Sequence, residues 1–266
     1  MSADGSGEVA VQRTLDILVY LSRSATPVSA ATIARDCAIP RSSVYRMLRV
    51  MLRMHIVVHL PDEHLWGVGI RAFEIGSGYL RNDALERPAR PLLAGLTERT
   101  RMTSHLAVMH GSDVLYLLKQ TTDEPARPFV TAIGVRLPAH LTAVGRAMLS
   151  DLSTAQVRAA LSDQSVLVSR TGIGPRTLAE LRPILREDRH RGYSIETGTT
   201  SEEVSCIAAA VHDHRGHPIA AVGVSHHDGL APSRIQAVAR AVTTTARELT
   251  RRVGGTSSEE VLDRAQ

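Results

Sequence analysis

The sequence predicts an α+β protein made of two parts, and three observations support this fold class. Residues 9–69 have the pattern of three short helices followed by a pair of strands. Residues 91–254 alternate strand pairs with helices, a pattern typical of a mainly antiparallel sheet. Between the two parts, residues 70–90 are expected to form a linker helix that ends near Pro88 and Pro91.

Composition and charge give the first indication of function. The formal net charge of +4 is modest, and the low aromatic fraction of 3% predicts a core of aliphatic residues. The basic residues are unevenly spread, because residues 35–53 contain five arginines and a single acid, Asp36. A local run of this kind indicates an anionic partner such as nucleic acid.

Cysteine usage and hydropathy predict the compartment. Cys37 and Cys206 are too few and too far apart for a disulfide framework, which favours a reducing environment. The stretch "MSADGSGEVA" has no apolar signal region, and no apolar run approaches the length of a membrane span. We expect a cytoplasmic protein without a membrane partner, with a disordered tail at residues 1–8 and a flexible one at residues 255–266.

Two helices are expected first. In "VAVQRTLDILVYLSRS", the residues Val11, Leu15, Leu18 and Val19 share one face, which we expect to be buried. Ser29 then stands where it can cap the short helix "AATIARDCA", and Pro40 separates that helix from the next one.

The third helix carries the strongest functional signal. Its core face follows helical spacing in "SVYRMLRVMLR", and its other face contains no acid. The strand-like stretches "HIVVHL" and "LWGVG" follow, separated by a turn at "PDEH". Three helices and a hairpin form a winged helix-turn-helix, whose third helix enters the major groove of double-stranded DNA. The predicted DNA contacts are Arg41, Ser42, Ser43, Tyr45, Arg46 and Arg49; the alternative is a solvated basic face in an unrelated α domain.

The linker helix is predicted from about Ile70 to Leu85. An uncharged patch around Phe73, Ile75 and Gly76 suggests that it also contributes to a dimer contact.

The second part shows two hairpins and several helix starts. The first hairpin joins "TSHLAVMH" to "VLYLLKQ", and the second joins "VSCIAAAVHD" to "PIAAVGVSH". A further strand is expected at "RPFVTAIGV", and Pro183 is expected to kink its helix or delay its start. Capping boxes predict three helix starts, at Ser153 with Gln156, Thr177 with Glu180, and Ser233 with Gln236.

The segment "HLTAVGRAML" has the properties of an anion site. Thr142 can cap a helix that begins at Ala143, and the small residues after it leave the backbone amides accessible. A small carboxylate would suit such a site, and Arg146 would add positive charge. The alternative is an ordinary capped helix whose small residues allow close packing against a sheet.

Histidines in "VHDHRGHP" and "SHHDG" raise the possibility of a metal site. His212 and His214 would share one face of a strand, as two ligands of one metal ion would. The stretch also falls where a hairpin turn is expected, so solvated turn residues are the preferred interpretation, and no metal or cofactor is predicted. The chain has no GxSxG elbow, no HExxH and no phosphate-binding glycine loop.

Taken in order, several of these segments resemble the IclR family of bacterial transcription regulators. The resemblance is carried by "SAATIARDCAI", "IPRSSVYRMLRVM", "LPAHLTAVGRAML", "RGYSIE" and "SCIAAAVHDHRGHPIAAVGVS", and spans nearly all of residues 9–254. It implies a winged helix-turn-helix followed by an effector-binding domain related to GAF and profilin-like sheets. It also implies dimers or tetramers on short, roughly palindromic operators, acting as repressors or activators.

By position, the resemblance places an effector pocket in the second part. It implies that the pocket is formed by Ala143, Val144, Glu196, Cys206, Gly223 and Ser225. Glu196 stands where the family commonly has Asp, and Gly223 stands where some members have Ser, so the pocket here would have one hydroxyl fewer. Cys206 alone would otherwise be interpreted as a small buried hydrophobe.

These observations predict a homo-oligomeric, ligand-responsive DNA-binding regulator with a small organic acid as effector. Two alternatives remain for the second part: an enzyme that processes a metabolite, and a dimerisation module that binds no ligand.

Overall fold

The structure, a computed structural model, describes residues 4–82, 85–121, 129–161, 166–227 and 229–256. The chain divides into two compact units, residues 1–82 and residues 83–266.

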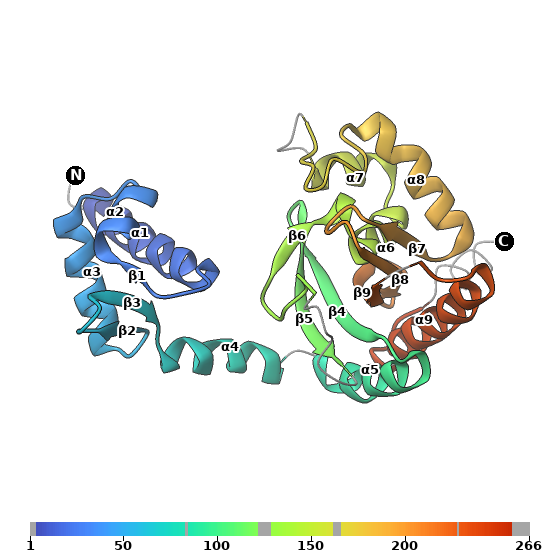
Figure 1. The fold of residues 1–266 in the computed structure, drawn as a ribbon, viewed down its shortest axis with the longest axis horizontal. Coiled ribbons are helices and arrows are strands. Elements are labelled where there is room, and N and C mark those ends of the chain that lie inside the picture. Colours follow the sequence, from blue (N-terminus) through green and yellow to red (C-terminus); the bar gives the residue numbers. More distant parts are fainter. Residues whose placement is uncertain (1–3, 83–84, 122–128, 162–165, 228, 257–266) are drawn as a thin grey trace. The chain divides into compact units, whose positions relative to one another are not determined.

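The first unit contains the three expected helices and a small sheet (Figure 1). Helices α1 (Asp4–Arg23), α2 (Ala30–Asp36) and α3 (Arg41–Arg53) pack around a core that includes Trp66. Strands β2 (Val57–Leu60) and β3 (Leu65–Val68) form the predicted hairpin. A third strand, β1 (Val28–Ser29), was not predicted because only two residues pair with β3. The Ser29 side chain accepts a hydrogen bond from the Thr32 amide, as expected of an N-cap.

Helix α1 differs from the prediction in the face that it buries. Ile17 and Leu21 are buried, and Leu18 is half-buried. Val11, Leu15 and Val19, which were expected in the core, are 62%, 56% and 46% exposed. The helix carries two apolar stripes, and the sequence pattern does not say which of them meets the rest of the unit.

The segment after the hairpin forms two helices. Helix α4 spans Ile70–Asn82, and α5 spans Glu86–Thr100, so a second helix begins inside residues 70–90, where a single linker helix was expected. Pro88 and Pro91 lie inside α5 rather than ending a helix. Pro88 lies in the first turn, where backbone N–H groups have no intrahelical acceptor, and Pro91 removes only one intrahelical bond.

The second unit is built on one antiparallel sheet of six strands in the order β6-β5-β4-β9-β8-β7. Both predicted hairpins are present and occupy its centre. The strands are β4 (Thr103–His110), β5 (Asp113–Gln120), β6 (Arg136–Pro138), β7 (Ser194–Thr197), β8 (Val204–His212) and β9 (Pro218–His227).

Helices cover both faces of this sheet (Figure 1). Helices α5 and α9 (Pro232–Arg252) pack on one face through aliphatic residues such as Leu96 and Val242. The other face is covered by α6 (Ala143–Ser150), with α7 (Thr154–Ala160) and α8 (Leu178–Arg191) beyond it. This arrangement confirms the α+β fold class. Among the described residues, no helix is long and apolar enough to cross a membrane.

Two local predictions in this unit are wrong. Of the expected strand "RPFVTAIGV", residues 129–135 form no strand, because the chain turns at Gly134, whose φ is +83°. The paired strand is β6, immediately after it, and residues 127–128 lie outside the described residues. Ser233 does not cap α9, which begins at Pro232 without a side-chain cap. The favourable φ of proline at a first helical position explains this earlier start.

Of the other two capping predictions, one is confirmed in full and one in part. Ser153 and Gln156 form the complete reciprocal capping box at the start of α7. Thr177 accepts from the Glu180 amide, while the Glu180 carboxylate accepts from the Arg176 amide instead of closing the box. Pro183 lies within α8, which still begins at its cap.

Candidate functional site

The polar face of α3 is exposed and has no partner of its own. Arg41, Arg46, Arg49 and Arg53 are exposed, and none of them pairs with an acid within the described residues. Ser42 is exposed, while Ser43 and Tyr45 are half-buried. The Arg41 guanidinium lies 5.8 Å from the centre of the Tyr45 ring, which fits a cation–π contact. The opposite face, with Val44 and Leu48, is completely buried.

The single acid of residues 35–53, Asp36, is already engaged on another helix. Asp36 accepts hydrogen bonds from the Tyr20 hydroxyl at 2.7 Å and from the Arg35 Nε at 2.7 Å. The bond from Arg35, followed by that from Tyr20, lowers the pKa of Asp36 below its ordinary value. The positive charge of α3 is therefore not neutralised by its neighbours, and it is available to phosphates.

Helix α6 has the opposite character, because all eight of its residues are buried. Thr142 caps it as predicted, with its side-chain oxygen 3.0 Å from the Gly145 nitrogen. The backbone N–H groups of Ala143 and Val144 are left without a partner in the described part of the chain. Gly145 is required by space, since a Cβ there would lie 2.3 Å from the Ala139 carbonyl oxygen. The helix start thus presents two free amides at its positive end.

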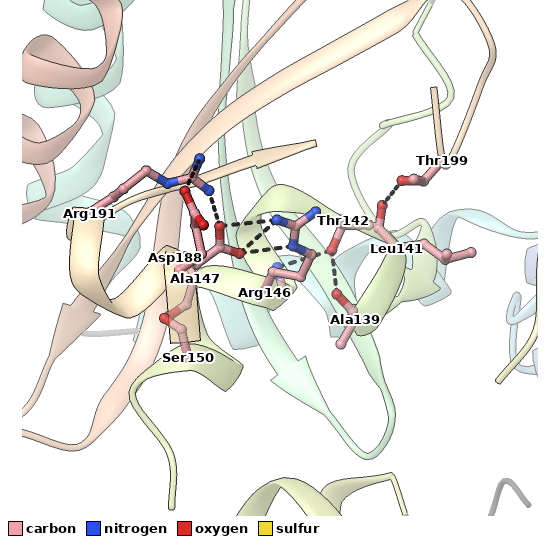
Figure 2. Close-up of polar contacts among 11 residues, drawn as sticks. Ala139, Leu141, Thr142, Arg146, Ala147, Ser150, Asp188, Arg191 and Thr199 are labelled. Carbon is pink, nitrogen blue, oxygen red and sulfur yellow. Dashed lines mark hydrogen bonds and ion pairs between the residues drawn. The ribbon is translucent and has the colours of Figure 1, made fainter. Parts of the chain in front are cut away.

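Arg146 does not serve the role expected of it. Its guanidinium makes two hydrogen bonds to the Asp188 carboxylate of α8, at 2.9 and 3.0 Å, and both side chains are buried (Figure 2). Arg191 donates to the same carboxylate. The charge of Arg146 is therefore engaged inside the protein, and it adds little to an anion site at the helix start.

Polar residues face α6 along two rows that cross the sheet. In the first row, Thr103 of β4 pairs with Ser225 of β9, Ser225 with Cys206 of β8, and Cys206 with Glu196 of β7. In the second row the corresponding residues are His105, Gly223, Ala208 and Ser194. Directly opposed residues in antiparallel strands share one face, so each row presents its side chains together. The structure thus brings the residues that the resemblance implied onto one face beneath the start of α6.

Glu196 is buried and only half satisfied. Its Oε1 accepts from the amides of Thr199 and Thr200, at 2.7 and 3.3 Å, and contacts the Thr199 hydroxyl. Its Oε2 is buried with no hydrogen-bond partner among the described residues. Burial raises the pKa of this carboxyl above its ordinary value of 4.5, and the bonds from Thr199 and Thr200, together with the nearby Cys206 thiol, oppose that shift. A buried oxygen without a partner is costly to the fold.

Thr199 links Glu196 to the segment that precedes α6. Its hydroxyl donates to the Leu141 carbonyl, two residues before the free amide of Ala143 (Figure 2). The same hydroxyl contacts Glu196, so one side chain joins the acid to the helix start.

Cys206 and Ser225 form a second polar pair in the first row. The Cys206 Sγ lies 3.1 Å from the Ser225 Oγ, and both side chains are buried. Burial raises the pKa of the Cys206 thiol well above its ordinary value, so the sulfur is held as the thiol. This arrangement agrees with a small buried residue and gives no support to a reactive thiolate.

Three residues at this face were missed in the sequence: His105, Tyr116 and Thr199. His105 and Tyr116 lie on the buried strands β4 and β5, where a polar residue inside an apolar run was the available signal. Thr199 follows β7 in a stretch rich in Thr and Ser, and only the folded loop shows which hydroxyl meets Glu196.

The histidines of the β8–β9 turn form no metal site in the described residues, which contain no cluster of three potential ligands. His212 instead contacts the Asp151 carboxylate, with 2.7 Å between its Nε2 and the acid's Oδ2.

Comparison with known proteins gives two family matches along the chain. Residues 10–61 match the IclR helix-turn-helix domain, and residues 77–251 match the C-terminal domain of the bacterial transcriptional regulator IclR.

Curated relatives cover nearly the whole chain. The HTH-type transcriptional regulator BhcR of Paracoccus denitrificans is 30% identical over 253 residues, which are 94% of this chain and 89% of that protein. The acetate operon repressor of Salmonella typhimurium is 28% identical over 264 residues, or 96% of this chain and 94% of the repressor.

A solved structure has the same fold. It is an IclR homologue from Microbacterium hydrocarbonoxydans in complex with 4-hydroxybenzoate, with a TM-score of 0.77 and 24% identity. The match covers 92% of this chain and 98% of that one. The helix-turn-helix, the antiparallel sheet domain and both family matches lead to one conclusion: this chain belongs to the IclR family of bacterial transcription regulators.

Proposed function

We propose that this regulator binds a short palindromic operator as a homo-oligomer and responds to a small organic acid. The observation that carries the proposal is the pair of amides at Ala143 and Val144, which have no acceptor among the described residues and begin a helix that packs against β7, the strand that carries Glu196. The family membership makes the chain a transcription regulator and leaves the enzyme alternative without support.

The DNA half of the proposal rests on α3. Its arginines are exposed and unopposed within the described residues, and its N-terminal end carries small hydroxyl residues that can approach base edges. The guanidinium groups suit phosphate oxygens or guanine. The residues proposed to contact DNA are Arg41, Ser42, Ser43, Tyr45, Arg46 and Arg49.

The effector half rests on α6 and the polar rows. A carboxylate would accept hydrogen bonds from the amides of Ala143 and Val144 at the positive end of the helix. Ser225 and Glu196 would hold a hydroxyl or carbonyl group elsewhere on the same molecule. Cys206 and Gly223 would line the space between them. A related structure binds 4-hydroxybenzoate, which is an acid with a hydroxyl group, and this supports the proposed ligand class.

Self-association is proposed through the exposed apolar residues of α4. Ile70, Phe73 and Ile75 are 66%, 70% and 61% exposed, which is costly for a free helix in water. A second copy of the chain is the proposed occupant, because a palindromic operator is read by two symmetric helix-turn-helix units. Sedimentation of the chain at micromolar concentration tests this. A stable monomer, with and without DNA, would contradict it. Action on DNA also implies a cytoplasmic location.

The response would arise because the acid binds one arrangement of the paired units more tightly than another. Only such a difference in affinity can shift the equilibrium between operator-binding and released forms.

The experiment compares operator binding with and without a small acid in two proteins. In the wild-type chain, a screen of small carboxylates by thermal shift is expected to yield at least one acid that changes operator affinity. In Ala143→Leu, the longer side chain should cover the amides and abolish that response while operator affinity is retained. If Ala143→Leu responds as the wild type does, the acid binds elsewhere. If no acid binds the wild type, the ligand-free dimerisation alternative takes the place of the sensor.

A further inference from the structure

His105 lies at the end of the second polar row and is a neighbour of the start of α6. It is 1% exposed, and its Nδ1 is buried without a hydrogen-bond partner among the described residues. A Cβ added to Gly223 would lie 2.9 Å from the His105 Nε2 and 3.0 Å from the Val144 Cγ1. The imidazole and the side chain of Val144 therefore converge on the space that a side chain at position 223 would need.

This geometry explains why glycine stands at position 223. A serine there would bring its Cβ closer to both neighbours than such atoms normally approach. The imidazole of His105 therefore takes the place in which a serine hydroxyl would stand.

The imidazole is neutral at physiological pH. Complete burial, reinforced by the charge of Lys119, lowers its pKa to about 3. Its ring packs edge-on against Tyr116, with the ring centres 5.3 Å apart. A neutral imidazole has one N–H donor and one acceptor nitrogen. It can pair with a hydroxyl or an oxo group, and it offers no charge to a second carboxylate.

We infer that His105 is a specificity-determining contact of the effector site, where a ring nitrogen reads a hydroxyl or oxo oxygen on a small monocarboxylate. This inference rests on the proposed function, because the carboxylate of the same molecule is held by the amides of Ala143 and Val144. Dicarboxylates are excluded, since a second anion would face a neutral ring and the acid Glu196.

The unpaired nitrogen distinguishes this role from simple core packing. A buried polar atom without a partner is costly to the fold, and a leucine or phenylalanine at this position would avoid that cost. His105 and Glu196 each hold one such atom on the same face of the sheet. The ring nitrogen nearest position 223 is Nε2, so a ligand at the start of α6 would pair with Nε2.

The test uses two matched pairs of acids that differ by one hydroxyl group, propionate with lactate and benzoate with 4-hydroxybenzoate. Binding to the full chain is measured by calorimetry, together with Ala143→Leu, His105→Phe and His105→Asn. In the wild type, the hydroxylated member of one pair should bind between about twofold and tenfold more tightly, the range of one neutral hydrogen bond. The pair that shows this preference also reports whether the site takes compact or ring-bearing acids.

His105→Phe should bring the ratio within that pair to about one while the affinity for the unsubstituted acid stays within about twofold, because only one hydrogen bond is removed. His105→Asn, which keeps a donor and an acceptor, should retain a preference. The double variant His105→Ala with Gly223→Ser should regain one, since the serine hydroxyl enters the vacated space. These two variants decide the matter if His105→Phe does not fold.

Three outcomes overturn the inference, and they can be told apart. If Ala143→Leu abolishes binding but His105→Phe keeps the hydroxyl preference, the carboxylate site stands and the role of His105 is wrong. If the wild type binds both members of each pair equally, the site does not read a hydroxyl group. If no acid binds the wild type, or if Ala143→Leu binds like the wild type, the proposed site fails and this inference fails with it.

Discussion

Two helices in this protein use arginine in opposite ways. On α3 the arginines are exposed and meet no acid within the described residues. On α6 the single arginine, Arg146, is buried and held by two hydrogen bonds to Asp188. The first arrangement leaves charge available to a partner, and the second uses charge to connect α6 to α8.

The difference shows that surroundings, rather than residue type, decide what a charge does. An exposed guanidinium costs little to keep and gains from a polyanion. A buried one is expensive unless a carboxylate meets it, so its value to the fold depends on the pair remaining complete. Changes in the two helices should therefore separate cleanly into effects on DNA binding and effects on stability.

The largest effect is expected from Asp188→Ala, which leaves the Arg146 guanidinium buried without its partner. The free energy of unfolding should fall by about 3–5 kcal/mol, the usual cost of breaking a buried pair from one side. Urea denaturation followed by circular dichroism measures it.

The control is the double variant Arg146→Met with Asp188→Leu, which should recover most of the loss because no buried charge remains. A loss below about 1 kcal/mol in Asp188→Ala, the value of an exposed pair, would contradict this view of α6.

Arg46→Ala and Arg49→Ala should leave stability within about 0.5 kcal/mol of the wild type, since both side chains are exposed. Each should weaken operator binding, by about 1–3 kcal/mol if the arginine reads a base. If it contacts a phosphate, the negative slope of log K against log salt should become shallower by about 0.9. Fluorescence anisotropy across a salt series distinguishes the two roles. Unchanged operator binding in both variants would mean that α3 does not bind in the major groove.

The dependence of stability on pH below neutrality distinguishes buried groups that are charged from buried groups that are neutral. His105 is neutral when folded, with a pKa of about 3, whereas the unfolded imidazole titrates near its ordinary value of 6.5. The unfolded chain therefore binds more protons between these values. The stabilisation is complete above pH 6.5 and is lost as the pH falls towards 3.

His105→Asn should reduce the dependence of the unfolding free energy on pH in this window, by at most about 1.4 kcal/mol per pH unit. Glu196 works in the opposite direction, because its raised pKa makes stability fall as the pH rises above 4.5. Denaturation at several pH values measures both, with Glu196→Gln as the matched control. An unchanged acid limb in His105→Asn would mean that this imidazole is not held neutral by burial.

The smallest effect is expected from Ser225→Ala. The Ser225 hydroxyl pairs with the Cys206 sulfur and belongs to the first polar row. Its removal should weaken effector affinity by about 0.5–1.5 kcal/mol, the net value of one neutral hydrogen bond. Operator affinity without effector should not change, which provides the control. A larger loss of affinity for the operator than for the effector would mean that Ser225 supports the fold and does not contact the effector.

The sequence predicted the buried face of α3 better than it predicted the buried face of α1. The core face of α3 follows helical spacing, and Val44, Met47, Leu48 and Met51 are buried as that spacing requires. On α1 two apolar stripes compete, and only tertiary packing decides that Ile17 rather than Leu15 enters the core.

The face of the sheet beneath the start of α6, where the effector site is proposed, was predictable in part. Thr142 and the small residues after it identified the helix start directly, because capping is a local interaction. The partners of Arg146 and Glu196 were not predictable, since Asp188 lies 42 positions from Arg146 and the two polar rows depend on strand register. His105 was missed for the same reason, because its neighbour Gly223 is brought to it only by the pairing of β4 with β9.

The two polar rows also bear on how such a regulator could acquire a new signal. Adjacent strands hold their backbones together through main-chain hydrogen bonds, so the register is kept when a side chain in a row is exchanged. Positions 223 and 105 are one example, because they oppose each other on β9 and β4 and a side chain at either position would enter the same space. If the proposed pocket binds the effector, a combinatorial library confined to these rows would vary the recognised molecule while the architecture stays constant, which would make the domain a starting point for engineered biosensors.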